Sequence, residues 1–141
     1  MKQEDKDLLF QDLCARLPYG VKVQFNDIIT SPAILKGINK DFIECDIAVC
    51  ELEDIKPYLF PLESMTEEQL NDFYATIRPV IEVALDAYKD DKTEYDGERP
   101  ITLNDIKTDI VAVNWMLKNH FDMNDLIPKR FAVDATGLNI Y

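Results

Sequence analysis

The sequence contains few of the residues from which common catalytic and metal sites are built. Of its 141 residues one is histidine, three are cysteine and four are glycine. A single histidine excludes zinc motifs that need two, and no GxSxG, GxGxxG or GxxxxGK motif is present. We therefore expect no cofactor, no bound metal and no catalytic residue. A cysteine paired with His120 is the one cysteine-nucleophile arrangement that the composition allows.

Long apolar runs are also missing. No run approaches the roughly 18 residues of a membrane span, and the first ten residues are too acidic for a secretory signal. These absences predict a cytoplasmic protein that does not bind membranes. The cysteines Cys14, Cys45 and Cys50 have no CxxC spacing, which indicates reduced, buried thiols. On one straight strand Cys45 and Cys50 would point to opposite faces, which argues against a shared metal.

Charge is abundant but unevenly placed. The net charge is -12, and residues 40–98 hold 17 acidic and 5 basic side chains. Such a field repels nucleic acid and favours a protein with a basic surface as the partner. The alternative is a surface that only keeps the protein soluble. The candidate binding residues on this acidic segment are Glu51, Glu53, Asp54, Asp90, Asp91, Glu94, Asp96 and Glu98.

One stretch resembles a calcium loop, because Gly97 follows Asp96 as in the middle of an EF-hand. Placing Gly97 at the sixth position of the loop puts Lys92 at the first position and Leu103 at the twelfth. Both positions require carboxylates, so an EF-hand is excluded. A loose cation site remains as an alternative to a solvated loop, formed by Asp90, Asp91, Glu94, Asp96 and Glu98.

Hydrophobic periodicity predicts a helix and a sheet in the first 62 residues. Leucines four apart predict an amphipathic helix over residues 4–17, which Pro18 and Gly20 end. Alternating apolar residues predict strands over 21–25 and 32–38. Residues 39–41 then suit a tight antiparallel hairpin.

The stretch 41–62 is the one around which we expect the sheet to be organised. Ile43, Cys45, Ile47 and Val49 alternate with polar or small residues, which predicts one buried strand. After Leu52 the prolines Pro57 and Pro61 leave room for at most a short edge strand, because proline cannot donate to a ladder. The sheet is therefore expected to end here.

From residue 64 the apolar period becomes helical. Thr66 with Gln69 forms a capping box, and the helix should break before Pro79, which begins a second helix. An acidic loop at 90–100 follows. Thr102 with Asp105 then opens the longest helix, in which apolar residues step by threes and fours. These apolar residues are Leu103, Ile106, Ile110, Val113, Leu117 and Phe121, with Val111 and Trp115 beside them.

The end of that helix and the tail after it carry weaker signals. His120 lies where a protonated imidazole suits the negative end of the helix dipole, so we interpret it as a capping residue. In the tail after Asp122, residues 131–133 can form a short edge strand.

Three segments resemble a known group of proteins: LPYGVKV (17–23), DIKPYLFPLESMTEEQ (54–69) and NHFDMNDLIPK (119–129), with a terminal tyrosine. Together they are similar to small proteins of gut Bacteroidales and of their phages and mobile elements. The resemblance implies an intracellular protein of a bacterium or of a phage that infects it, but it assigns no activity and no functional residue. Those proteins have Tyr-Arg-Gly where this chain has Met123, Asn124 and Asp125.

A second, weaker resemblance covers residues 17–62. Their order of elements is similar to Sm-like and other SH3-type small barrels, with Gly37 at the bend of a strand. This likeness implies a strongly bent sheet and not RNA binding.

Together these observations predict an α+β fold in one domain spanning residues 1–141. Residues 1–62 supply a helix and a small bent antiparallel sheet, for which a barrel is the alternative form. Residues 63–121 supply about three helices, and 122–141 an irregular tail. The leading functional hypothesis is a non-enzymatic protein that binds another protein. The alternatives are a nucleic-acid mimic that inhibits a DNA-binding host protein, and an enzyme with a site near His120.

Overall fold

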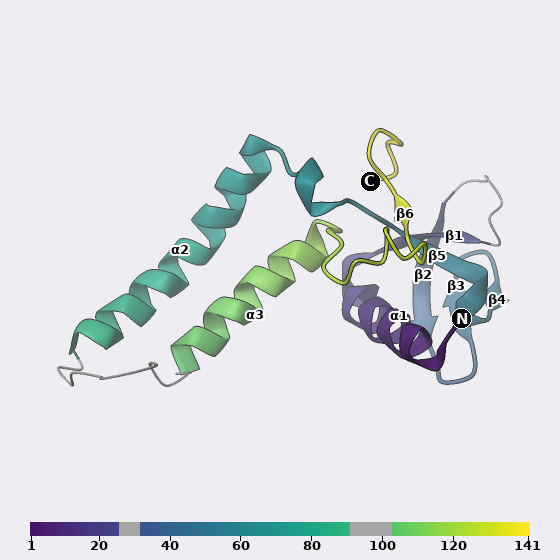
Figure 1. Cartoon of the computed structure of the whole chain (residues 1–141), viewed down its shortest axis with the longest axis horizontal. Coiled ribbons are helices and arrows are strands. Elements are labelled where there is room, and N and C mark those ends of the chain that lie inside the picture. The colour runs from purple at the N-terminus through teal and green to yellow at the C-terminus, as the bar shows by residue number, and fades with distance from the viewer. Residues whose placement is uncertain (26–31, 91–102) are drawn as a thin grey trace. The chain divides into compact units, whose positions relative to one another are not determined.

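The computed structural model describes residues 1–25, 32–90 and 103–141, with residues 83–90 and 103–105 described by their backbone alone. It has an N-terminal helix, a six-stranded mixed sheet and further helices (Figure 1), which confirms the α+β prediction. The chain divides into two compact units. Residues 1–65 and 116–141 form the sheet unit, and residues 66–115 form the helical unit.

Helix α1 (Gln3–Arg16) opens the sheet unit. Its Leu9 and Leu13 lie one turn apart and are fully buried, as their four-residue spacing predicted. The helix ends in a 3-10 turn, η1 (Leu17–Tyr19). Gly20 follows with a φ of 67°, a left-handed conformation that glycine adopts without strain and that lets the chain turn into the first strand.

Six short strands form one open sheet in the order β4-β3-β2-β1-β5-β6. All neighbouring pairs are antiparallel except β5 with β6, which is parallel. The sheet does not close, so the barrel-like form is not adopted. The strands are β1 (Lys22–Phe25), β2 (Ala33–Ile38), β3 (Ile43–Cys45), β4 (Val49–Cys50), β5 (Ile55–Leu59) and β6 (Val133–Asp134).

The predicted hairpin between β2 and β3 is confirmed. The backbone N–H of Asn39 donates to the carbonyl of Phe42 at 2.9 Å, which closes the turn. The pairing register of the two strands shifts between Leu35 and Gly37. Such an irregularity bends a strand, and it lies at the glycine where the resemblance to small barrels implied a bend.

The single strand predicted over residues 43–49 is wrong, because a turn divides it into β3 and β4. Ile47 in the turn is 61% exposed and Val49 is 63% exposed, whereas Cys50 is buried. The alternation of buried and exposed side chains holds only within a continuous strand. After the turn, the even-numbered Cys50 is buried instead of the odd-numbered Val49. Ile43 and Cys45, which precede the turn, are buried as predicted.

The prediction that the stretch after Leu52 forms at most a short edge strand, at which the sheet ends, is also wrong. β5 contains Pro57, is largely buried and lies between β1 and β6. Among the described residues β6 pairs with β5 at Tyr58 and Leu59, so Pro57 has a strand partner on the β1 side alone. A proline is tolerated where one side of its strand is unpaired. β6 lies at the end of the segment where a short edge strand was predicted.

The core of the sheet unit lies between α1 and the sheet. Its buried side chains come from α1, from Val21 and the strands β1 to β5, and from the segment after α3. The segment after α3 matters, because its Leu126 is fully buried beside residues more than a hundred positions earlier. The main members are Leu9, Leu13, Val21, Val23, Ala33, Leu35, Ile43, Ile55, Leu59, Leu126 and Ala132.

Helix α2 (Glu67–Asp90) of the helical unit begins at the predicted capping box. The N–H of Thr66 donates to Gln69 Oε1 at 2.9 Å, and the N–H of Gln69 donates to Thr66 Oγ1 at 3.1 Å. The predicted break at Pro79 is wrong, because α2 runs through it. Pro79 leaves the carbonyl of Ala75 without a helical donor, but both residues are exposed, so water can satisfy that carbonyl.

Helix α3 (Leu103–Lys118) contacts α2 through Trp115. The Trp115 ring meets the Phe73 ring edge-on at 5.1 Å, and its indole N–H donates to Asp72 Oδ2 at 2.8 Å. In the described chain two long helices follow residue 63 instead of about three, and α2 is the longer. The predicted cap of α3, Thr102 with Asp105, lies outside the residues whose side chains are described. No described helix has the length and apolarity needed to span a bilayer.

Candidate functional site

Three predicted binding residues lie together at the 3-10 turn η2 (Leu52–Asp54), where local contacts occupy them. The N–H of Glu51 donates to Asp54 Oδ2 at 3.0 Å, and the Glu51 side chain accepts from the N–H of Asp54. Glu53 forms an ion pair with Lys6, whose hydrogen bond lowers the pKa of Glu53 and raises that of Lys6. The ion pair therefore offsets the charge of Glu53, whereas Glu51 and Asp54 keep their charge and use part of their hydrogen-bonding capacity within the turn.

An open groove beside η2 carries both signs of charge. Lys6 and Lys40 line it together with four carboxylates, and Phe10 and Leu52 supply its apolar part. A groove with interspersed charges does not select strongly for a basic partner. The four carboxylates are Asp7, Asp41, Glu51 and Glu53.

The other predicted binding residues follow α2. Asp90 is the last residue of that helix. Asp91, Glu94, Asp96 and Glu98 lie outside the described residues, and so does the loose cation site proposed for them. Within the described ranges, no group of three or more histidine, cysteine, aspartate or glutamate side chains could hold a metal ion.

Two of the three cysteines lie side by side. Cys45 and Cys50 are both buried and their thiols hydrogen-bond to each other, because the β3–β4 turn brings both to the same side of the sheet. The prediction that they point to opposite faces is therefore wrong. Burial, followed by the neighbouring thiol, raises the pKa of Cys45 to about 12, so it is a weak nucleophile. Cys14 is exposed, contrary to the prediction.

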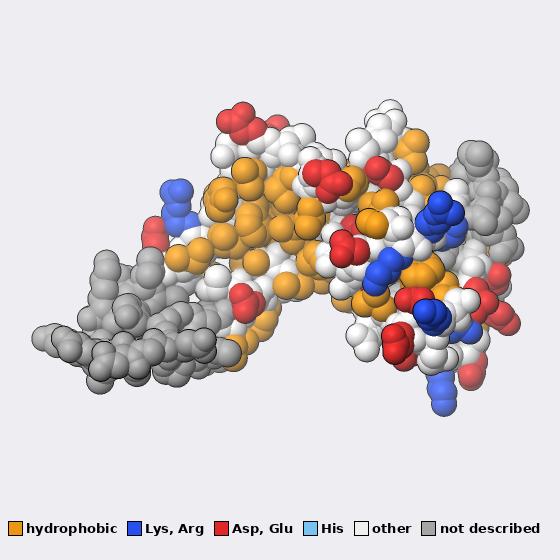
Figure 2. Space-filling view, viewed as in Figure 1, with side chains coloured by type: hydrophobic (Ala, Val, Ile, Leu, Met, Phe, Trp, Pro, Cys, Tyr) orange, Lys and Arg blue, Asp and Glu red, His pale blue; other side chains and the backbone are white. Residues whose placement is uncertain are grey.

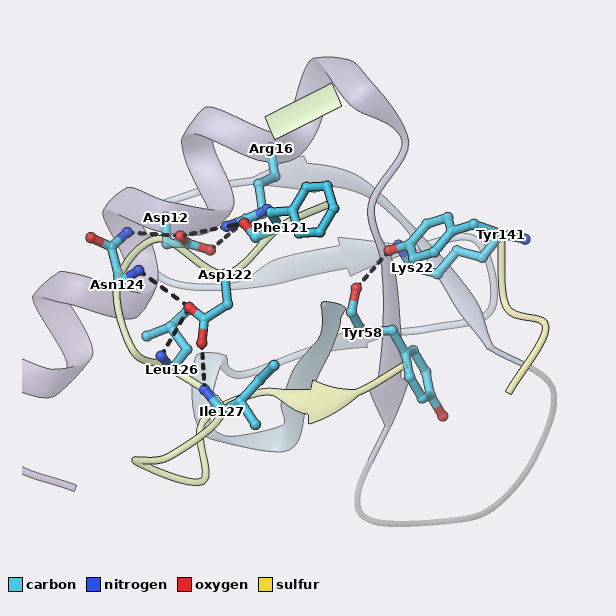
Figure 3. Close-up of polar contacts among 10 residues, drawn as sticks. All are labelled: Asp12, Arg16, Lys22, Tyr58, Phe121, Asp122, Asn124, Leu126, Ile127 and Tyr141. Carbon is cyan, nitrogen blue, oxygen red and sulfur yellow. Dashed lines mark hydrogen bonds and ion pairs between the residues drawn. The ribbon is translucent and has the colours of Figure 1, made fainter. Parts of the chain in front are cut away.

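A buried ion pair joins α1 to the segment after α3 (Figure 3). Arg16 is fully buried; its Nε donates to Asp12 Oδ2 at 2.6 Å, and its Nη2 donates to Asp12 Oδ1 at 3.2 Å and to the carbonyl of Phe121 at 2.7 Å. Asn124 Nδ2 also donates to Asp12 Oδ1, at 2.9 Å. Arg16 Nη1 is buried without a partner. An Asp and an Arg four apart are usually an exposed helical pair, so no sequence pattern indicated this cluster.

Asp122 organises the turn that follows (Figure 3). Its Oδ1 accepts from the N–H groups of Asn124 at 3.2 Å and Leu126 at 3.0 Å, and its Oδ2 accepts from the N–H of Ile127 at 2.9 Å. Asp125 within the turn has a φ of 54°, a left-handed conformation that aspartate tolerates better than most residues. Asp122 therefore holds the segment that delivers Leu126 to the core.

Tyr141 bridges two strands of the sheet. Its hydroxyl accepts from the N–H of Lys22 in β1 and donates to the carbonyl of Tyr58 in β5, each at 2.9 Å. Its ring stacks on the imidazole of His120, with centroids 3.6 Å apart and planes 10° apart. Lys22 Nζ also donates to the carbonyl of Ile140 at 2.6 Å. Tyr141 and Ile140 therefore attach the last residues of the chain to β1 and β5.

His120 ends α3 through its backbone. Its N–H donates to the carbonyl of Leu117 at 3.1 Å, and its φ of 64° is the left-handed conformation common after a helix. The prediction that His120 is protonated at the end of the helix is wrong at neutral pH. Burial, and then the charges of Arg16 and Lys22, lower the His120 pKa to about 4. The imidazole, whose Nδ1 has no hydrogen-bond partner, is covered by Tyr141.

We expect stability to fall as the pH is lowered from 6.5 to 4. The His120 pKa is about 4 when folded and about 6.5 when unfolded, so the unfolded state binds more protons in this window. The contribution is full above pH 6.5, and about 2–3 kcal/mol is lost on reaching pH 4. Urea unfolding of the wild type and of His120→Asn, which tolerates the left-handed backbone, would measure it. Parallel losses in both proteins would contradict the prediction.

The helical unit exposes large apolar side chains beside acidic ones (Figure 2). On α2, Leu70 and Tyr74 are exposed and Ile81 is partly exposed, and Asn71, Tyr74, Ala75, Ile77, Arg78 and Ile81 line an open groove. On α3, the stripe of Ile106, Ile110 and Val113 is exposed. The sequence predicted these apolar stripes but not their exposure.

Comparisons of the chain with protein-family models, with curated proteins and with solved structures found no match. The geometry of its own residues is therefore what bears on its function.

Proposed function

We propose that the protein acts by binding another protein that carries a basic surface, and that α2 supplies the contact. The observation that carries this proposal is one exposed face of α2. Leu70, Tyr74 and Ile81 lie along it. By helical geometry the exposed Glu67 lies beside this face, and the exposed Glu82 lies about 100° around the helix from its middle. By sequence α2 holds six acidic and two basic residues, so its net charge is -4.

The arrangement suits a helix that enters a groove on its partner. In that recognition mode apolar side chains spaced by helical turns fill the groove, while charges at the rim set the orientation and the rate of encounter. Tyrosine is among the residues that most often dominate binding energy, so Tyr74 is the expected anchor. Arg78 is the one described cation on this face, and it would meet the least basic part of the partner.

The other two hypotheses have less support. Nucleic-acid mimicry requires an array of free carboxylates, whereas Glu51, Glu53 and Asp54 are engaged in local contacts. Catalysis near His120 requires an accessible imidazole, whereas Tyr141 stacks on it. A DNA-binding protein as the captured partner would favour the mimic.

Reversing charge on α2 should weaken binding to a partner captured from host lysate. Glu67→Lys with Glu82→Lys should lower affinity at least about tenfold at low salt, and the loss should shrink at 1 M salt, where the Debye length is about 3 Å. Glu44→Lys with Glu63→Lys, two exposed acids of the sheet unit, makes the same charge change as a control. The affinity of each double variant for the partner is measured over a salt series. Equal losses of affinity in the two double variants would reject α2 as the binding site.

A further inference from the structure

The exposed stripe on α3 has the spacing of a coiled-coil seam. Ile106, Ile110 and Val113 succeed one another at intervals of four and three residues, and they are 47%, 52% and 45% exposed. At 3.6 residues per turn, these three side chains lie within about 60° of one another around the helix. Apolar residues alternating by threes and fours on one narrow face pack against a second helix that carries the same pattern.

Helix α2 is not that second helix. Trp115, which contacts Phe73 and Asp72 of α2, lies about 170° around α3 from the middle of the stripe by helical geometry. The face of α3 that meets α2 is therefore the opposite one. An outward row of large aliphatic side chains is unfavourable in water and usually marks a contact surface.

We propose that this stripe binds the same stripe of a second copy of the chain, so that the protein forms a dimer through α3. Charge selects this occupant. By sequence α3 holds two acidic and two basic residues, so it has no net charge, while the chain carries -12. Two such chains repel each other, and the electrostatic repulsion between them is smallest when they meet through a face without net charge. A basic partner would gain no electrostatic attraction from that face.

The stripe is also complementary to itself. A two-fold dimer places the same patch on both subunits, and a regular four-and-three row of aliphatic residues provides knobs and holes to its own copy. Ile110 is the central residue, so a two-fold axis through the middle of the stripe brings Ile110 close to Ile110 of the second copy.

The size of the stripe sets the expected strength. Three side chains bury much less than the roughly 800 Å² per partner of a standard stable interface. The dimer should therefore be reversible, with a Kd in the micromolar range or weaker. Salt should strengthen it by screening the repulsion between the acidic subunits, whereas binding of a basic partner to α2 should weaken. Because salt is expected to change dimerisation and partner binding in opposite directions, the two proposals can be tested independently.

Sedimentation velocity of the full chain over a concentration series, at low salt and at about 0.5 M salt, tests the proposal. The wild type should show a monomer–dimer equilibrium that shifts toward dimer with concentration and with salt. Ile110→Lys should reduce association at least about tenfold. Asn114→Lys adds the same charge at an exposed position of α3 beside the stripe and should keep the dimer. Circular dichroism confirms that each variant keeps its helices.

A mixing experiment tests the contact itself. Ile110→Lys and Ile110→Glu should each be monomeric alone, and an equimolar mixture should recover the dimer because opposite charges then meet across the axis. Ile106→Lys, a second change within the stripe, should also be monomeric. A wild type that is monomeric at every concentration, or a dimer that survives both Ile110→Lys and Ile106→Lys, would overturn the proposal.

Discussion

Arg16→Ala is expected to destabilise the protein by about 3–5 kcal/mol, because it leaves the buried Asp12 carboxylate without its cation. The substitution also removes the donor to the carbonyl of Phe121, so α1 loses one of its hydrogen bonds to the segment after α3. A small protein has a total stability of about 5–15 kcal/mol, so the variant should be partly unfolded or close to it. Urea unfolding at pH 7, followed by circular dichroism, measures the effect.

The Lys6–Glu53 pair provides a matched control. It also joins a base of α1 to an acid, but at an exposed position, where solvent screens the attraction. Lys6→Ala should therefore change the unfolding midpoint little. Replacing both buried partners, with Asp12→Leu and Arg16→Met, should recover part of the loss because no unpaired charge remains. If Arg16→Ala cost no more than Lys6→Ala, Arg16 would not be buried against Asp12 in solution.

The second large effect is expected from Asp122→Ala. It removes the acceptor of three backbone N–H groups. Two of these belong to Leu126, which lies in the core, and to Ile127, which packs against the core. Because these donors are left unsatisfied, we expect a loss of about 2–4 kcal/mol. Hydrogen exchange should localise it, with the amides of Leu126 and Ile127 exchanging much faster than in the wild type.

Asp134→Ala is the control for that experiment. Asp134 accepts one hydrogen bond, from the N–H of Thr136 at 2.9 Å, in an exposed turn. Its removal should cost much less, because water can replace the lost acceptor. Equal destabilisation by the two substitutions would show that Asp122 does not hold its turn in the way described.

Features of the fold that depend on neighbours in sequence were predictable. The capping box at Thr66 and Gln69, the hairpin at 39–41 and the buried leucines of α1 each depend on residues within a few positions. In these cases the local chemistry has one strongly favoured conformation, and the rest of the protein does not oppose it.

Features that depend on distant partners were not predictable. Pro57 indicated the end of the sheet. However, β6, which lies more than seventy residues later, pairs with Tyr58 and Leu59, the two residues that follow Pro57. The burial of Arg16 depends on the carbonyl of Phe121, an acceptor that lies more than a hundred positions later in the chain. On α3, apolar spacing identified the apolar face but not whether anything covers it. The single binding surface predicted from charge likewise included Glu53, whose ion pair with Lys6 the sequence did not reveal.

The division of the sheet unit into two chain segments has a consequence for folding during synthesis. At about 5–20 residues per second, the ribosome takes some 3–10 seconds to make residues 66–115 after β5 has emerged. During this interval β5 has an unpaired edge, and the core lacks Leu126 and Ala132. The helical segment depends on more local contacts and can form before β6 completes the sheet. A nascent chain stalled at this stage would present a strand edge and apolar surface together, which are the features that molecular chaperones bind.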